Sequence, residues 1–176
     1  MQGRIVLKDG REAVYRRSRR DDEEALCRMF DGLTQDSLYM RYVGYHKPTR
    51  EEIRAILEKE GTQEICLVAS PAGNEREIVA QIRCILLNPP TDAELAIVVH
   101  DDWQNQGLGT ALVQAIVRWA IQAGVERIVG VMGLSNDRMI HVFNKLGFAT
   151  RDSEYDTLKM ARLLPSARTK QKSQQA

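Results

Sequence analysis

Short hydrophobic runs occupy the first third of the chain, and their spacing changes from one segment to the next. Alternating positions predict two strands at 4–8 and 12–17, with a turn at Asp9-Gly10 between them. Helical spacing follows: acidic residues open a predicted helix at 21–31, and a second short helix is predicted at 34–41. Thr49 and Glu52 form a capping box that predicts the start of a third helix, which Gly61 ends.

Continuous apolar runs replace the helical spacing from residue 65 on and predict buried strands. Three such runs, at 65–69, 77–87 and 93–99, are separated by turn signals at 71–74 and 89–90. A long helix is predicted from Gly107 to Ala123, because its apolar residues fall along one side. A strand at 127–131, a helix that Ser135 caps and Gly147 ends, and strands at 148–152 and 157–163 complete the series.

This order of elements is typical of an α/β domain with a mixed sheet. The chain has 176 residues, the size of one ordinary domain, and 43% of them are hydrophobic, which is enough for a core. We expect one domain over residues 1–164 and a polar, disordered tail over 165–176.

Charge and composition exclude several classes of partner. With 25 basic and 24 acidic residues, the formal net charge is +1, so we expect no nucleic acid as the main partner. No run approaches the roughly 18 apolar residues of a membrane span, and the start lacks the pattern of a signal peptide, so we predict a cytoplasmic protein without membrane contact. Cys27, Cys66 and Cys84 are far apart and lack zinc-ligand spacing, so we expect reduced thiols and no metal.

One polar loop carries the pattern of a ligand site. A predicted strand ends near Val99, a polar segment follows, and Gly107 and Gly109 open the long helix. The backbone amides of a helix start are unpaired and suit a phosphate or pyrophosphate, and glycines allow a ligand to approach closely. A dinucleotide fingerprint would need a glycine where Leu112 stands, and a Gly-Lys-Ser/Thr phosphate loop is absent. An ordinary strand-to-helix loop remains open on the glycines alone.

The wider pattern resembles that of an enzyme superfamily. Gln104-x-x-Gly107-x-Gly109 resembles the acyl-CoA pyrophosphate motif of the GNAT acetyltransferases, and Asn136 with Leu146-Gly147-Phe148 resembles a second marker of that superfamily. This resemblance implies an α/β fold with a mixed, mostly antiparallel central sheet flanked by helices. It also implies acetyl-CoA as co-substrate, no metal, and N-acetyl transfer to an amine.

The N-terminal third narrows the resemblance. The segments 19–24, 30–34 and 37–42 resemble the acetyltransferase domain of bacterial Pat-type protein lysine acetyltransferases. This implies a lysine on a protein as acceptor, with acyl-CoA synthetases as first candidates, and the charged helical faces at 19–24 and 50–60 would offer a docking surface. Acetylation of a small amine and a non-catalytic acyl-CoA sensor remain as alternatives.

Individual roles follow from the chemistry and the resemblance together. A lysine amine has a pKa of roughly 10.4, so transfer needs a base near the thioester. Glu94 is the predicted base, and the competing interpretation is a strand-edge glutamate that pairs with an arginine. The resemblance implies that cofactor contacts come from backbone at the end of the preceding strand, from the polar loop, and from an asparagine on the next helix: Ile97, Val98, Val99, Gln104, Asn105, Gln106, Gly107, Leu108, Gly109, Thr110 and Asn136.

One position departs from the family pattern. Many GNAT enzymes have a tyrosine general acid seven residues after the asparagine, and this chain has Phe143 there. A thiolate with a pKa of roughly 8.5 leaves readily, so an acid helps but is not essential. His141 and Tyr155 are candidate substitutes.

Overall fold

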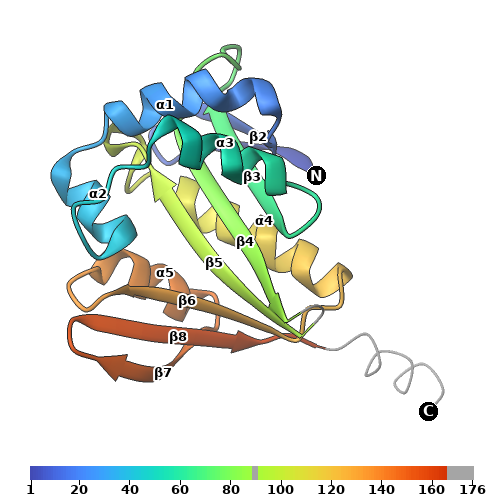
Figure 1. Cartoon of the computed structure of the whole chain (residues 1–176), viewed down its shortest axis with the longest axis vertical. Helices are drawn as coiled ribbons and strands as arrows, with labels where there is room; N and C mark the ends of the chain where they lie inside the picture. Colours follow the sequence, from blue (N-terminus) through green and yellow to red (C-terminus); the bar gives the residue numbers. More distant parts are fainter. Residues whose placement is uncertain (89–90, 166–176) are drawn as a thin grey trace.

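A computed structural model describes residues 1–88 and 91–165, in which eight strands form one sheet. Figure 1 shows the sheet, whose strand order is β1-β2-β3-β4-β5-β6-β8-β7. Every neighbouring pair is antiparallel except β5 and β6, which are parallel. The predicted mixed, mostly antiparallel sheet is therefore confirmed. The strands are β1 (Gln2–Val6), β2 (Glu12–Arg17), β3 (Glu64–Pro71), β4 (Ala80–Asn88), β5 (Asp92–Val99), β6 (Arg127–Gly133), β7 (Ala149–Glu154) and β8 (Thr157–Leu163).

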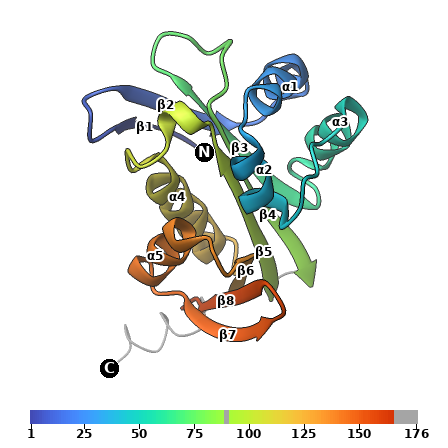
Figure 2. The same cartoon turned by 90° about the vertical axis from the view of Figure 1, so that its left-hand side faces the viewer.

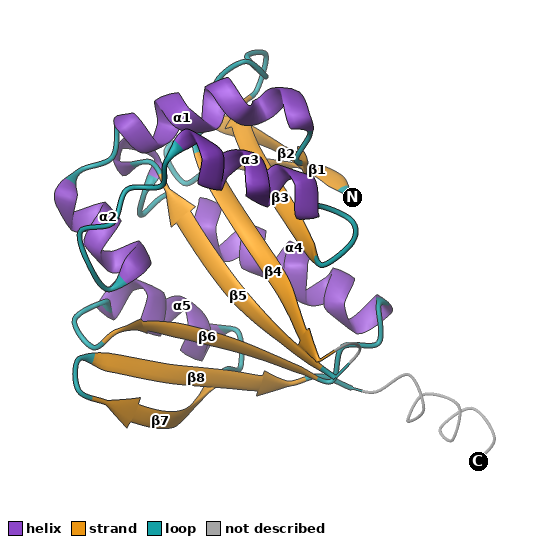
Figure 3. Ribbon diagram, in the orientation of Figure 1, coloured by secondary structure: helices purple, strands orange, loops and turns teal. Residues whose placement is uncertain are grey.

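Helices cover both faces of the sheet (Figures 2 and 3). On one face lie α1 (Glu23–Asp31), α2 (Gln35–Tyr42) and α3 (Arg50–Lys59), and on the other lie α4 (Leu108–Gln122) and α5 (Asp137–Lys145). Two short 3-10 helices, η1 (Arg20–Asp22) and η2 (Asp101–Trp103), precede α1 and α4. Each face has its own apolar core, the first built around Leu26, Phe30, Ile53 and Val68, the second around Ile82, Leu112, Ile116 and Ile128.

The two halves of the sheet part in the middle. The ladder between β5 and β6 has three rungs, from Asp92 opposite Arg127 to Glu94 opposite Val129. Beyond Glu94 the strands diverge, and Figure 1 shows β6, β8 and β7 turning away from β4 and β5. Within residues 1–88 and 91–165, the edge of β5 that faces β6 therefore has no strand partner after Glu94, although β4 pairs with β5 up to Val99.

Several local predictions need correction. The first strand runs over 2–6 rather than 4–8, so the turn that contains Asp9 and Gly10 begins earlier, and the Gly10 amide bonds back to the Leu7 carbonyl at 3.0 Å. The fourth strand begins at residue 80 rather than 77, and β7 runs from 149 to 154. The predicted tail lies, from residue 166 on, outside the described residues, as do residues 89–90.

The cap of α5 was also assigned to the wrong residue. The side chain of Asn136, not Ser135, accepts a hydrogen bond from the Met139 amide, at 3.1 Å. Gly61 and Gly147 do end their helices in left-handed conformation, with φ values of 81° and 78°.

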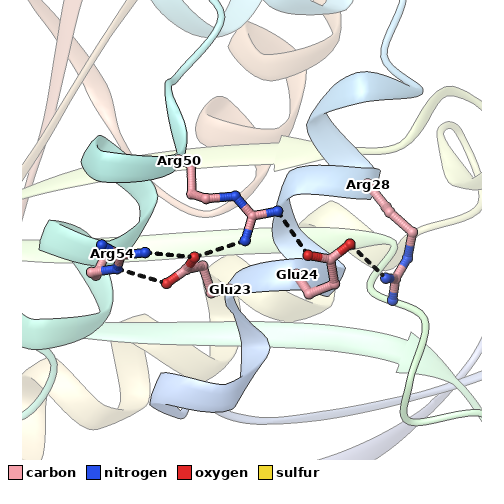
Figure 4. A network of polar contacts seen from close by, with 5 residues as sticks. All are labelled: Glu23, Glu24, Arg28, Arg50 and Arg54. Atoms are coloured by element: carbon pink, nitrogen blue, oxygen red, sulfur yellow. Dashed lines mark hydrogen bonds and ion pairs between the residues drawn. The ribbon is translucent and has the colours of Figure 1, made fainter.

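The charged faces of α1 and α3 bind each other. Arg50 donates to Glu23 at 2.9 Å and to Glu24 at 2.7 Å, and Arg54 donates to Glu23 at 2.9 Å (Figure 4). Arg28 adds a contact of 3.3 Å to Glu24 within α1. These charges pair with one another across α1 and α3, and the docking surface on these two faces stays a prediction.

The described residues contain neither a membrane-spanning helix nor a cluster of metal-ligating side chains. No helix in residues 1–88 and 91–165 combines the length and the apolarity that crossing a bilayer requires. Within the same ranges, no three His, Cys, Asp or Glu side chains are grouped so that they could hold a metal ion.

Candidate active site

The start of α4 lies beside the end of β5. Gly107 and Asn105 adopt positive φ values of 92° and 61°, which turn the chain sharply into the helix. No side chain of the described residues caps this helix, so its first-turn amides have neither an intrahelical acceptor nor a capping side chain there. A Cβ atom at Gly109 would stand 3.8 Å from the side chains of Ile97 and Val99. The predicted pyrophosphate loop therefore presents free amides next to the open edge of β5.

The loop is tied to α2 by a polar network. The Asp101 carboxylate accepts hydrogen bonds from the Thr34 amide at 3.0 Å, the Thr34 hydroxyl at 2.8 Å and the Ser37 hydroxyl at 2.6 Å. Burial acts to raise the pKa of Asp101, but these hydrogen bonds outweigh it and lower the pKa below its ordinary value. The Gln104 amide donates at 2.9 Å to both the Ser37 hydroxyl and the Val99 carbonyl. The side chain of Gln104 thus joins the loop to α2 and to the end of β5.

A small cleft separates β5 from β6 where the strands part. Asn136 lies at this cleft, and its amide nitrogen donates to the Met40 carbonyl at 3.4 Å. The cleft measures about 30 Å³, and its walls come from α2, β5, β6 and α5, including Arg41, Ala96, Ile97, Met132, Asn136 and Phe143. The structure thus brings the predicted Ile97 and Asn136 together, and it adds the end of α2 as a wall that the motifs did not indicate.

Glu94 lies at the apex of the opening, opposite Val129 in the last rung between β5 and β6. Its other neighbour in register is Ile85, which places it on the same face of the sheet as Arg83. Arg83 is held by Glu64, with contacts of 3.1 and 2.6 Å to a carboxylate that is 1% exposed. Among the described residues, no cation forms an ion pair with Glu94. The alternative of a glutamate that only pairs with an arginine therefore has no support here.

Arg41 is a cation that lines the cleft. Its guanidinium carbon stands 4.6 Å from the centre of the Tyr42 ring, and Glu94 is close enough to attract it. Burial lowers the pKa of Arg41, with repulsion from Arg83 acting in the same direction. Arginine still remains protonated, because its ordinary pKa exceeds 12. Arg41 therefore brings a positive charge to the cleft, and among the described residues it forms no ion pair with Glu94 at the apex.

Residues 29–148 match the Acetyltransferase (GNAT) family. The chain belongs to this family. Domains of this family are acetyl-CoA-dependent N-acetyltransferases, which is the activity that the sequence motifs of this chain imply. The match covers more than half of the chain and includes Glu94, the loop before α4 and Asn136.

Individual relatives agree with this assignment. Acetyltransferase Pat of Mycolicibacterium smegmatis is 28% identical over 115 residues, which are 65% of this chain and 34% of that protein. The chain thus spans about a third of the length of this curated relative. The GNAT domain of S. lividans Pat superimposes with a TM-score of 0.85 at 24% identity, over 93% of this chain and 97% of the other. Spermidine N-acetyltransferase from Vibrio cholerae, in complex with CoA and spermine, gives a TM-score of 0.70 at 15% identity over 86% and 95%. These two structural likenesses show the fold.

Phe143 replaces the tyrosine of many GNAT enzymes. Its ring is 1% exposed and stacks on Phe148 at 4.3 Å between centroids. It also lies over Gly130, where a Cβ atom would come within 2.2 Å of the ring. Neither of the candidate substitutes, His141 and Tyr155, lines the cleft, and Tyr155 is 92% exposed. The structure therefore offers neither of these residues as a general acid within the cleft.

The cysteines are not suited to nucleophilic catalysis. Burial raises the pKa of Cys66 and Cys84 to about 12, so both thiols are neutral at pH 7. Burial also raises the pKa of the partly exposed Cys27. All three are free thiols and pack as small apolar side chains.

Motif reasoning missed four residues of the site, namely Thr34, Ser37, Arg41 and Arg138, the last of which donates to the Gln104 side chain. Thr34 and Ser37 lie within the Pat-like segment, but nothing in the pattern connects them to Asp101, about 65 residues away. Arg41 and Arg138 were missed for the same reason, since each reaches the site only through folding. A larger hollow of about 390 Å³, between α1 and residues 74–79, contains none of the motif residues.

Proposed function

We propose that this GNAT domain, residues 1–164, transfers the acetyl group of acetyl-CoA to a lysine amine on a protein, by direct attack in a ternary complex. One observation carries the proposal. The two halves of the sheet part at Glu94, which has no ion-pair partner among the described residues, and the uncapped start of α4 lies beside the resulting opening. The pyrophosphate, the pantetheine arm and the thioester of acetyl-CoA can thus be held in one line.

Acetyl-CoA would be held mainly by backbone groups. The loop from Gln104 to Thr110 suits its pyrophosphate, because the uncapped helix start at its end carries partial positive charge. The edge of β5 at Ile97, Val98 and Val99 has no strand partner on the β6 side among the described residues, and it suits the pantetheine arm, which can hydrogen-bond like an added strand. The Asn136 amide lies at the same cleft and can bind the arm if it leaves the Met40 carbonyl.

The chemistry needs one base and an electron-poor carbonyl. Acetyl-CoA supplies the thioester. Glu94 takes the proton of the attacking amine, directly or through one water, and holds it while the carbon–nitrogen bond forms and the carbon–sulfur bond breaks. Backbone amides of the open β5 edge can donate to the thioester oxygen as it gains charge. Phe143 cannot protonate the departing thiolate, which is a good leaving group.

The charges around the cleft favour a neutral amine as nucleophile. Arg41 lines the cleft with its positive charge, and a cation beside a bound amine disfavours the ammonium form. The same charge opposes a polyamine, which carries several positive charges at once. A single lysine side chain that enters from the α2 side meets less opposition.

The choice of a protein acceptor rests on likeness to Pat proteins. The segments that resemble Pat-type enzymes form α1 and α2, and α2 forms one wall of the cleft. The free cysteines are compatible with the reducing cytoplasm, where we propose that the enzyme acts.

Labelled acetyl-CoA tests the acceptor directly. The purified enzyme would be mixed with a panel of acyl-CoA synthetases and, in parallel, with polyamines, amino acids and aminoglycosides, and the products would be identified by mass. We expect label on lysines of one or more synthetases. Efficient transfer to a small amine alone would contradict the protein acceptor, and binding of acetyl-CoA without transfer to anything would favour a sensor.

A further inference from the structure

The predicted pyrophosphate loop contains no charge of its own. From Gln104 to Thr110 the sequence is Gln-Asn-Gln-Gly-Leu-Gly-Thr, so the loop can offer only amides and neutral side chains. The diphosphate of acetyl-CoA carries two negative charges. A nearby cation would therefore add attraction that the loop lacks, and the structure shows where one lies.

Arg138, the second residue of α5, reaches the loop. Its guanidinium Nη1 donates a hydrogen bond to Gln104 Oε1. The orientation of the Gln104 side-chain amide is determined by its nitrogen. Gln104 Nε2 is 2.9 Å from the Val99 carbonyl oxygen, which can only accept a hydrogen bond. The carbonyl end of Gln104 must then point toward Arg138. Gln104, which is itself fixed by its bond to Val99, thus holds the Arg138 guanidinium beside the loop.

Most of the binding capacity of Arg138 remains available. A guanidinium has five N–H donors, and the contact with Gln104 uses one nitrogen. Within the part of the chain that the structure describes, Arg138 has no carboxylate partner, and its side chain is exposed. Arg11, also near this loop, differs: it binds Asp9 at 2.8 Å and the Asp102 carbonyl at 2.7 Å.

We infer that Arg138 binds the diphosphate of acetyl-CoA while Gln104 holds its guanidinium in place. The inference rests on the proposed position of acetyl-CoA on this loop. Arg138 supplies the positive charge and a planar pair of donors, and the helix start supplies the amides. The guanidinium, from α5, and the amides, from α4, bind the same oxygen atoms of the diphosphate.

Ligands that differ in their phosphates test the inference by binding alone. Dissociation constants would be measured for acetyl-CoA, 3′-dephospho-acetyl-CoA and S-acetylpantetheine, the last by NMR shift titration because it lacks all phosphates. Arg138→Ala should raise the dissociation constants of the first two about tenfold and leave that of S-acetylpantetheine unchanged. Arg138→Lys should recover part of the loss, because lysine keeps the charge but not the fork.

Lys145→Ala is the matched control, since it removes an exposed cation from the same helix two turns away. It should change none of the three constants. An equal loss for S-acetylpantetheine would mean that Arg138 acts only through the shape of the loop and would overturn the inference. A loss for acetyl-CoA but not for the dephospho form would assign the contact to the 3′-phosphate and overturn it as well. Failure of the wild-type protein to bind acetyl-CoA would reject the proposed function, whereas normal binding by Arg138→Ala would reject this inference alone.

Discussion

At the scale of single residues, the site depends on which charges are already paired. Arg83 lies on the same face as Glu94 but is bound by the buried Glu64. Asp101 receives three hydrogen bonds from the start of α2, so its charge is fully used in holding that helix. Glu94, the base that we propose, forms no ion pair with a cation among the described residues.

Glu94→Gln should retain acetyl-CoA affinity and lose turnover by about 10²- to 10⁴-fold, the usual contribution of a general base. Activity should recover partly at high pH, because a lysine amine loses its own proton near pH 10.4. Calorimetry would measure the affinity, and initial rates across pH would measure turnover. Glu126→Gln, an exposed glutamate before β6, is the control. Near-normal turnover at pH 7 would place the base elsewhere.

Gly130 is a second residue-scale test, because it makes room for Phe143. A Cβ atom at this position would lie 2.2 Å from the Phe143 ring, so Gly130→Ala should lower the free energy of unfolding by about 1–3 kcal/mol through overpacking. Gly133→Ala in the same strand is the control, since its Cβ would meet its nearest neighbour at 3.9 Å. Denaturant unfolding would compare the two. Equal stability of both variants would show that Phe143 can move aside freely.

At the scale of elements, the site is an arrangement of α4, α5 and α2 around the parting of β5 and β6. The start of α2 is held by Asp101, and its last turn is reached by Asn136 through the Met40 carbonyl. Both anchors lie next to residues that we propose for acetyl-CoA binding. The acceptor side of the cleft, which α2 forms, is thus connected to the side that we propose for acetyl-CoA.

Gly109→Glu tests the start of α4. The new side chain would project toward Ile97 and Val99 and bring a carboxylate against the pyrophosphate, so acetyl-CoA affinity should fall at least 100-fold by charge repulsion, on the order of 3 kcal/mol. Gly109→Ala is the control, because its Cβ makes only ordinary contacts of 3.8 Å. Calorimetry on both folded variants would decide. Unchanged affinity in the glutamate variant would remove the loop from the binding site.

At the scale of the whole molecule, two cores on opposite faces of one sheet keep the opening in place. The first core is closed by α1 and α3, and the ion pairs of Figure 4 join these helices across their outer surface. Hydrogen bonds from Arg54 and Arg50 lower the pKa of Glu23 from 4.5 to about 2. The strength of the ion pairs between α1 and α3 should therefore depend on pH.

Because the folded pKa lies below the ordinary one, Glu23 should stabilise the fold fully above pH 4.5 and progressively less as pH falls toward 2. Glu23→Gln should lower the melting temperature at pH 7 by about 2 °C, as expected for the loss of exposed ion pairs. The difference from the wild type should shrink on acidification and vanish near pH 2. Glu58→Gln, an exposed glutamate of α3, should show no such trend. A difference that stays constant from pH 7 to pH 2 would contradict this account.

The sequence by itself determined what depends on neighbouring residues. Spacing of apolar positions and turn glycines located every α-helix and strand of the described chain to within a few residues, and the glycine motif located the loop before α4. Such patterns work because helix starts, turns and strand alternation involve residues close in the chain. The errors fell at boundaries and caps, as at Asn136, where several neighbouring residues can serve.

Tertiary structure alone decided which side chains meet. Met40 and Asn136 are 96 residues apart, and Ser37 and Gln104 are 67 apart, so no local pattern could join them. The pairing of Arg83 with Glu64, which leaves Glu94 free, and the contact of Arg138 with Gln104 arise in the same way. Charges on the two helical faces for which a docking surface is predicted pair with one another and join α1 to α3. Which charge finds which partner depends on distances across the packed sheet, and only the completed fold sets those distances.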